Sequence, residues 1–145
     1  MKVRQLLGTK GREVVTTEAE NTVEDAIRSL QLRKISALVV ADHGRPVGIF
    51  TERDVLIRVV DEARDPAATR VAEVMTGNPV VVTAAATINE AMAIVTEKRC
   101  RHLPVVDEGK LLGLVSAGDL TYWVTRGHEY HIQDLVNYIT GKYPV

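Results

Sequence analysis

The sequence predicts a mixed α/β (α+β) fold in which two β-α-β-β-α units pack with pseudo-two-fold symmetry and a C-terminal helix follows. Residues 22–60 reappear in altered form at 87–125, and each copy combines segments of helical periodicity with short β-branched runs. The chain has 145 residues, of which 46% are apolar and 26% charged, as in globular proteins. A sheet of two or three strands cannot bury its apolar face alone, so we expect the units to form one body.

The internal repeat sets the predicted domain boundaries. TVEDAI aligns with TINEAM, ALVVAD with HLPVVD, and PVGIFTERD with LLGLVSAGD. Upstream, VVTT resembles VVVT and VRQLL resembles VAEVM. We therefore assign residues 2–62 to the first unit and 71–126 to the second. Residues 61–70, DEARDPAATR, are polar, contain a proline and have no periodicity, which predicts a linker.

Each unit contains a capped helix followed by a hairpin. Thr22 and Thr87 are the predicted N-caps of helices over 22–33 and 87–98, and an acidic residue stands three positions later in each. The β-branched runs that follow are ALVVA and VGIF in one unit and LPVVD and LLGLV in the other. The segments DHGRP and DEGK between these runs predict hairpin turns.

The hairpin of each unit ends in the same seven-residue turn into a second helix. The turn reads GIFTERD at 48–54 and GLVSAGD at 113–119, and we expect the helices at about 52–61 and 117–126. After the second unit, apolar residues at helical spacing predict an amphipathic helix over about 128–140. Its apolar stripe packs on its own module, on a second copy of the chain in a homodimer, or on a regulated partner protein.

Composition excludes several classes of partner. The net charge of −1 gives no general attraction for nucleic acid or for an anionic membrane. No apolar run approaches the roughly 20 residues that cross a bilayer. Cys100 is the only cysteine, and the start MKVRQLLGTK lacks the apolar core of a signal peptide. We therefore expect a cytoplasmic protein with neither a nucleic-acid nor a membrane partner.

The doubled turn carries residues suited to a nucleotide. A strand-to-helix turn presents backbone N–H groups and the positive end of the helix dipole beside Thr51 or Ser116, and both favour a phosphate. Asp54 and Asp119, three residues later, are short acceptors that suit ribose hydroxyls. The same residue types favour helix starts without any ligand, so capping alone is the alternative interpretation.

The order of elements and the doubled turn G-h-h-[ST]-x-x-D (h apolar) resemble a tandem pair of CBS domains, the Bateman module, over about residues 2–126. The resemblance implies a module without catalytic activity that senses an adenosine ligand in clefts lined by both repeats. It also favours a homodimer, because paired units of this family commonly meet a second module through their helix faces. It implies a first cleft formed by Thr51, Arg53, Asp54, Asn78, Arg101 and His102. It implies a second cleft formed by Ser116, Asp119, Lys10, Val14, Ser36 and Ala37. The first set is more cationic, so we expect it to bind a phosphate tail more tightly.

No catalytic or metal centre is predicted. His128 and His131 are three residues apart on a predicted helix but lack the H-E-x-x-H pattern and a third ligand. The segment from Gly8 to Gly11 lacks the spacing of a P-loop, and Cys100 is expected to be an inert thiol.

The sequence therefore predicts a stand-alone regulatory module that binds AMP, ADP or ATP, needs no obligatory cofactor, and acts in trans on an unidentified protein. One alternative is a dimeric interaction scaffold that needs no ligand, and another is a binder of S-adenosylmethionine or NAD. A nucleotide hydrolase or transferase is disfavoured, because neither a metal cluster nor a general base is visible in the sequence.

Overall fold

The first repeat is built on a four-stranded sheet. A computed structural model describes residues 1–10 and 14–126 of the chain. In the sheet of the first repeat the strand order is β1-β2-β3-β4, with β1 parallel to β2 and the other pairs antiparallel. Its elements are β1 (Thr16–Thr17), α2 (Val23–Arg33), β2 (Ala37–Asp42), β3 (Arg45–Thr51), α3 (Glu52–Asp54), the π-helix η1 (Val55–Val60) and β4 (Thr76–Gly77).

The second repeat has the same plan on a three-stranded sheet. The strand order is β5-β6-β7, again with one parallel and one antiparallel pair. Its elements are β5 (Val82–Thr83), α5 (Ile88–Lys98), β6 (His102–Asp107), β7 (Lys110–Ser116) and a helix over 117–126. These elements confirm the predicted mixed architecture of two similar units. The helix predicted over 128–140 lies outside the described residues, as do His128 and His131.

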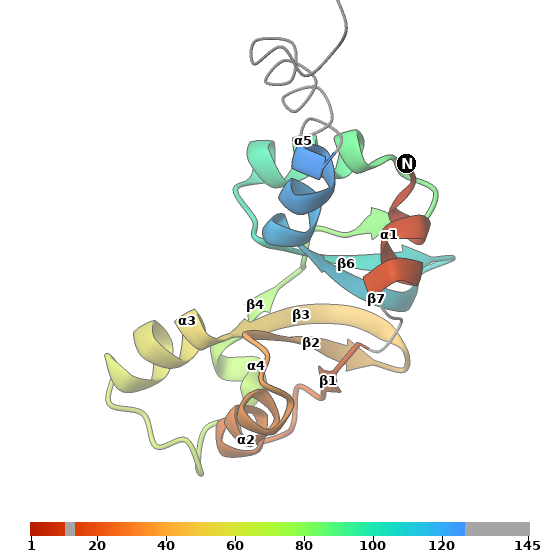
Figure 1. The fold of residues 1–145 in the computed structure, drawn as a ribbon. Helices are drawn as coiled ribbons and strands as arrows, with labels where there is room; N and C mark the ends of the chain where they lie inside the picture. The colour runs from red at the N-terminus through yellow and green to blue at the C-terminus, as the bar shows by residue number, and fades with distance from the viewer. Residues whose placement is uncertain (11–13, 127–145) are drawn as a thin grey trace, which may run out of the picture.

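The two repeats stack with β3 and β7 facing each other (Figure 1). A backbone hydrogen bond joins their hairpins, from the N–H of Leu111 to the carbonyl of Gly44 (2.8 Å). Each hairpin turns through two residues with positive φ, at 50° and 79° in the first repeat and 51° and 79° in the second. Positive φ at both central residues is typical of the tight turns that match the twist of paired strands, which explains the glycine in each.

The predicted N-caps are present, but the two capping boxes differ. Thr87 accepts a hydrogen bond from the N–H of Glu90 (3.0 Å), and the Glu90 carboxylate accepts one from the N–H of Thr87 (3.3 Å). Thr22 accepts from the N–H of Asp25 (3.2 Å). The Asp25 carboxylate instead lies 3.7 Å from the Arg28 guanidinium. The box is therefore complete only in the second repeat.

The helix that starts each repeat packs in the core of the other repeat. The core of the second repeat contains α1 (Val3–Lys10), whose residues Val3, Leu6 and Leu7 are buried there. The core of the first repeat contains α4 (Val71–Val74), which packs against Phe50 and its neighbours. Figure 1 shows α1 beside β6 and β7 rather than among β1, β2 and β3, which follow it in the sequence. The repeats thus exchange their first helices.

The glycine of each seven-residue turn lies against the exchanged segment. A Cβ atom on Gly113 would lie 2.8 Å from Cδ2 of Leu7 in α1. A Cβ atom on Gly48 would lie 2.5 Å from Sδ of Met75 and 3.1 Å from the backbone oxygen of Thr76. All three distances are shorter than ordinary van der Waals contacts, so the two glycines allow α1 and the segment after α4 to approach the sheets.

Candidate functional site

Both copies of the turn close a capping box. Thr51 Oγ1 accepts from the N–H of Asp54 (3.3 Å), and Asp54 Oδ2 accepts from the N–H of Thr51 (2.9 Å). Ser116 and Asp119 form the same pair of bonds at 3.0 Å and 2.9 Å. The motif therefore starts a helix in both repeats, as its residue types predict.

Three of the four backbone N–H groups at the helix start of each turn already have partners. The capping box uses the N–H groups of Thr51 and Asp54 in the first repeat and of Ser116 and Asp119 in the second. The N–H of Glu52 donates to the carbonyl of Ser36 (3.0 Å), and the N–H of Ala117 donates to the carbonyl of Arg101 (2.7 Å). Ser36 and Arg101 each come directly before the first strand of a hairpin, β2 or β6. A phosphate near either turn would therefore rely mainly on side-chain cations.

A cavity of about 730 Å³ lies beside Asp54, and we call it the first cavity. Its size lies within the range of roughly 300–1,000 Å³ that is usual for small-molecule sites. Asp54 is only 8% exposed, and its Oδ2 is engaged by Thr51. All six residues predicted for the first cleft line this cavity: Thr51, Arg53, Asp54, Asn78, Arg101 and His102.

Arg58 is a residue of the first cavity that the sequence analysis missed. Its Nη1 donates to the carbonyls of Val74 (3.0 Å) and Met75 (2.9 Å), and its Nε lies 3.8 Å from Asp54 Oδ1. Arg58 thus ties the helix of the turn to the exchanged segment. Its position four residues after Asp54 on a predicted helix is the signal that could have identified it.

The first cavity concentrates positive charge in a chain whose net charge is −1. Two further cations at the end of α5, Lys98 and Arg99, line it and were also missed. In all, the cavity is lined by five permanent cations and two carboxylates: Arg53, Arg58, Lys98, Arg99 and Arg101 against Glu52 and Asp54. Such an excess of one sign raises the local concentration of anions.

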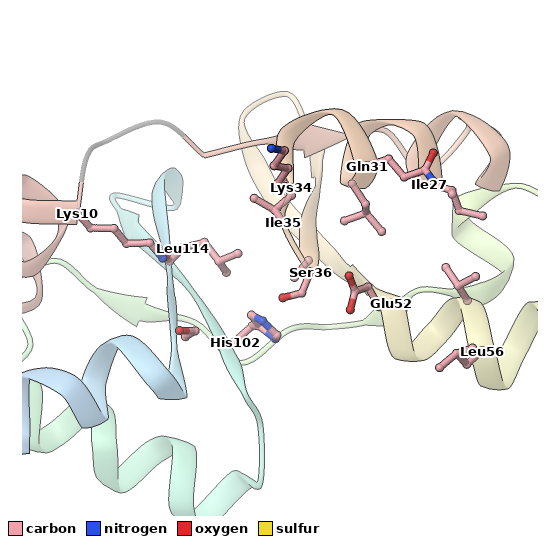
Figure 2. A pocket seen from close by; sticks show the side chains of 14 residues that line it. Lys10, Ile27, Gln31, Lys34, Ile35, Ser36, Glu52, Leu56, His102 and Leu114 are labelled. Atoms are coloured by element: carbon pink, nitrogen blue, oxygen red, sulfur yellow. The ribbon is translucent and has the colours of Figure 1, made fainter.

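A second cavity of about 900 Å³ lies on the other side of Glu52 and His102 (Figure 2). Four of the six residues predicted for the second cleft line it: Lys10, Ser36, Ala37 and Ser116. Asp119 is not in the cavity wall itself but is paired with Lys10, which is. Val14 does not line the cavity, because the chain there enters the edge of the first sheet, where the carbonyl of Val15 accepts from Val39.

The second cavity is more apolar than the first. Its charged wall residues are two lysines, Lys10 and Lys34, and one carboxylate, Glu52. The apolar part of the wall consists of Ile27, Leu30, Ile35, Ala37, Val55, Leu56 and Leu114. This difference agrees with the predicted ranking of the two clefts by positive charge.

The ammonium group of Lys10 forms an ion pair with Asp119, the carboxylate of the second turn. Its Nζ lies 2.5 Å from Asp119 Oδ2 and donates to the carbonyl of Leu114 at 2.9 Å. Burial acts to raise the pKa of Asp119, but hydrogen bonds from Lys10 and from Ser116 more than offset this effect and hold the pKa below its ordinary value. The carboxylate is therefore ionised and paired at neutral pH.

His102 lies in the wall between the two cavities, together with Ser36 and Glu52. Burial lowers the pKa of His102, and the positive charges of Lys10 and Arg101 lower it further, against a smaller opposing effect of Asp119. The imidazole is therefore neutral at pH 7, when it can both donate and accept a hydrogen bond.

Two structural features bear on other functions. In 1–10 and 14–126, no helix is both long and apolar enough to cross a membrane. Within the same ranges, no group of three or more His, Cys, Asp or Glu side chains is placed to hold a metal ion.

Comparisons with known proteins identify both repeats. The family model described as the CBS domain matches residues 3–61 and 71–126. The mitochondrial CBS domain-containing protein CBSX3 of Arabidopsis thaliana is 35% identical over 129 residues, which are 86% of this chain and 63% of that protein. The chain thus spans less than two thirds of this relative.

Two solved structures show the same fold. A protein with CBS domains from Burkholderia ambifaria MC40-6 is 42% identical, with a TM-score of 0.79 over 86% of this chain and 93% of that one. A CBS domain protein from Pyrobaculum aerophilum, solved in complex with AMP, is 24% identical, with a TM-score of 0.74 over 82% of this chain and 89% of that one.

Proposed function

This chain belongs to the CBS-domain family, and we propose that it is a regulatory module whose first cavity binds an adenine nucleotide of the AMP, ADP or ATP type. Proteins of this family are typically regulatory rather than catalytic. The observation that carries the proposal is the gathering of five cations around one cavity of nucleotide size, with the predicted ribose acceptor Asp54 in its wall. The AMP complex of the Pyrobaculum protein shows that this fold can hold AMP.

In the proposed pose, the phosphates lie among the arginines. Arg53 comes from the turn of the first repeat and Arg101 from the position just before β6 in the second, so one polyphosphate can contact both repeats. Arginine suits this task because its planar guanidinium donates several hydrogen bonds to phosphate oxygens. Each added phosphate brings more negative charge to the same cations, so we expect affinity to rise from adenosine to AMP to ATP.

The ribose and the base are placed by the remaining wall. Asp54 Oδ2 closes the capping box, which leaves Oδ1, 3.8 Å from Arg58, to accept a ribose hydroxyl. Ile49, Ile57 and Val80 supply apolar surface for the adenine ring. The same wall is compatible with the adenosine part of S-adenosylmethionine or NAD, so both belong in the ligand panel.

We propose that ligand binding changes how the two repeats are arranged relative to each other. A ligand that contacts both can shift their arrangement only if it binds one arrangement better than another. We propose that the response passes to an unidentified protein in trans and that the module acts as a homodimer. The closed capping boxes of both turns support one other function, a dimeric scaffold that needs no ligand.

Isothermal titration of the purified chain with AMP, ADP, ATP, S-adenosylmethionine and NAD tests the proposal. Asp54→Asn keeps an acceptor for the cap but removes the charge, and we expect it to weaken nucleotide binding at least about 10-fold, as for a lost charge-assisted hydrogen bond. Arg53→Gln is expected to weaken ATP more than adenosine. The matched control is Arg45→Gln, since Arg45 is exposed and does not line the first cavity.

Two results would count against the nucleotide site. If no ligand in the panel binds at millimolar concentration, the doubled turn serves only to start helices, and the scaffold function is favoured. If Arg45→Gln weakens ATP as much as Arg53→Gln does, binding follows net charge rather than the first cavity.

A further inference from the structure

The two copies of the turn differ in what their aspartate contacts. Asp119 Oδ2 accepts both the backbone N–H of Ser116 and the ammonium of Lys10, which comes from the end of the exchanged helix α1. In the first repeat, the cation near Asp54 is Arg58, at 3.8 Å from Oδ1, and it donates its hydrogen bonds to backbone carbonyls instead. The second carboxylate is thus directly paired, and the first is not.

The residue that corresponds to Lys10 in the other repeat is neutral. Extending the alignment of VRQLL with VAEVM without a gap places Lys10 opposite Asn78. Asn78 lines the first cavity, and among residues 1–10 and 14–126 it has neither a hydrogen bond nor an ion pair with Asp54. A lysine and an asparagine at equivalent places therefore account for the difference between the two carboxylates.

We propose that Lys10 closes the second cleft to nucleosides by occupying Asp119, the carboxylate that would otherwise accept a ribose. This inference rests on the proposed function of the first cavity. The Lys10 side chain is 41% exposed but held at both ends, because one face of its helix (Val3, Leu6 and Leu7) is buried in the core of the second repeat and its Nζ also donates to the carbonyl of Leu114 at 2.9 Å. Figure 2 shows the Lys10 side chain reaching along the cavity wall toward Leu114.

A nucleoside that used Asp119 would have to break this pairing. Both a ribose hydroxyl and the Lys10 ammonium can form a charge-assisted hydrogen bond to the Asp119 carboxylate, but only the ammonium adds the attraction between opposite charges. Displacing Lys10 also breaks its hydrogen bond to the carbonyl of Leu114. A neutral ribose therefore does not compensate for the loss of Lys10, and the second cleft stays closed at nucleoside concentrations that fill the first.

The test is Lys10→Asn, which copies the residue of the first repeat. Lys34→Asn is the matched control, because Lys34 lines the same cavity, no interaction joins it to Asp119 in the described chain, and asparagine tolerates its positive φ of 53°. Amide NMR spectra during titration with adenosine and with AMP give a dissociation constant for each turn, from the signals of Thr51 and Ser116. Adenosine is included because it has no phosphate, so the loss of the positive charge of Lys10 does not itself weaken its binding.

We expect adenosine to perturb Thr51 alone in the wild type and to perturb both turns in Lys10→Asn, with affinity at the second turn raised at least about 10-fold, as for removal of one charge-assisted hydrogen bond. Lys34→Asn should not raise it. Adding Asp119→Asn to Lys10→Asn should abolish the new binding.

The other outcomes separate the two proposals. If the first turn binds and Lys10→Asn leaves the second turn unresponsive, the closure by Lys10 is overturned while the nucleotide function stands. Binding of adenosine at both turns of the wild type with similar affinity would likewise overturn the closure by Lys10 and leave the nucleotide function standing. If neither turn responds in any variant, both proposals fail. A response of the second turn alone in Lys10→Asn supports the closure and refutes the first cavity.

Discussion

Gly113→Ala tests the close approach between the doubled turn and the exchanged helix. The added Cβ would lie 2.8 Å from Cδ2 and 3.2 Å from Cδ1 of Leu7, whereas carbon atoms in good contact are about 3.5–4.0 Å apart. Leu7 is only 5% exposed, so it cannot turn away into solvent. Either Leu7 changes its rotamer or α1 moves by several tenths of an ångström.

The expected cost follows from two opposing effects. Overpacking of a tight core costs about 1–3 kcal/mol. Gly113 has no positive φ, so alanine can adopt its backbone conformation and returns about 0.4–1 kcal/mol by restricting the unfolded chain. We expect a net loss of about 1–2 kcal/mol in the free energy of unfolding, which for a chain of this size lowers Tm by about 3–8 °C.

Urea and thermal unfolding followed by circular dichroism measure this loss. Gly118→Ala is the control, because a Cβ there meets nothing closer than Ser116 Oγ at 3.6 Å and alanine favours the helix. Leu7→Val should relieve part of the clash, so the double variant with Gly113→Ala should be more stable than the sum of the single losses predicts. A Gly113→Ala protein as stable as the wild type would refute the packing of α1 on the second sheet.

Three further predictions concern titration and capping. Because burial lowers the pKa of His102, the fold is most stable with a neutral imidazole, and this contribution is lost as the pH falls below about 6.5. In urea titrations, His102→Gln should therefore lose less stability than the wild type between about pH 7.5 and 5.5. An equal loss in both proteins would contradict the burial of His102. The pKa of Asp119 lies below 3.8, so its contribution is present above about pH 4 and is lost below it; Asp119→Asn should flatten the acid limb of the stability curve, and an unchanged limb would show that the pairing contributes nothing. Thr87→Ala should lower the free energy of unfolding by about 1 kcal/mol through loss of the capping box, whereas Thr96→Ala, at an exposed position in the last turn of the same helix, should change it by less than about 0.5 kcal/mol.

Lys10 also provides a ligand-free check on the second cleft. Its positive charge is one cause of the low pKa of His102. Lys10→Asn should therefore raise the His102 pKa, measured by NMR titration of the imidazole, while Lys34→Asn should leave it unchanged. An identical His102 pKa in wild type and Lys10→Asn would place Lys10 away from the wall that the two cavities share.

Much of the site could be predicted because its parts are local. The bonds of Thr51 to Asp54 and of Ser116 to Asp119 span three residues, so the motif alone specifies them. The residues predicted for the first cleft do line one cavity. Arg58, Lys98 and Arg99 were missed because arginine and lysine are common on exposed helix faces and nothing local indicates which of them faces a cavity.

The doubled unit, its caps, its hairpin turns and the two acidic turns could be predicted from the sequence, since each depends on contacts between residues close in the chain. The exchange of α1 and α4 between the two cores, and the pairing of the Lys10 ammonium with Asp119, are visible only in the folded chain. The similarity of the repeats explains this difference. VRQLL and VAEVM present similar apolar faces that suit either core, so pattern cannot assign them, and the choice follows from how the folded chain connects and packs its two sheets.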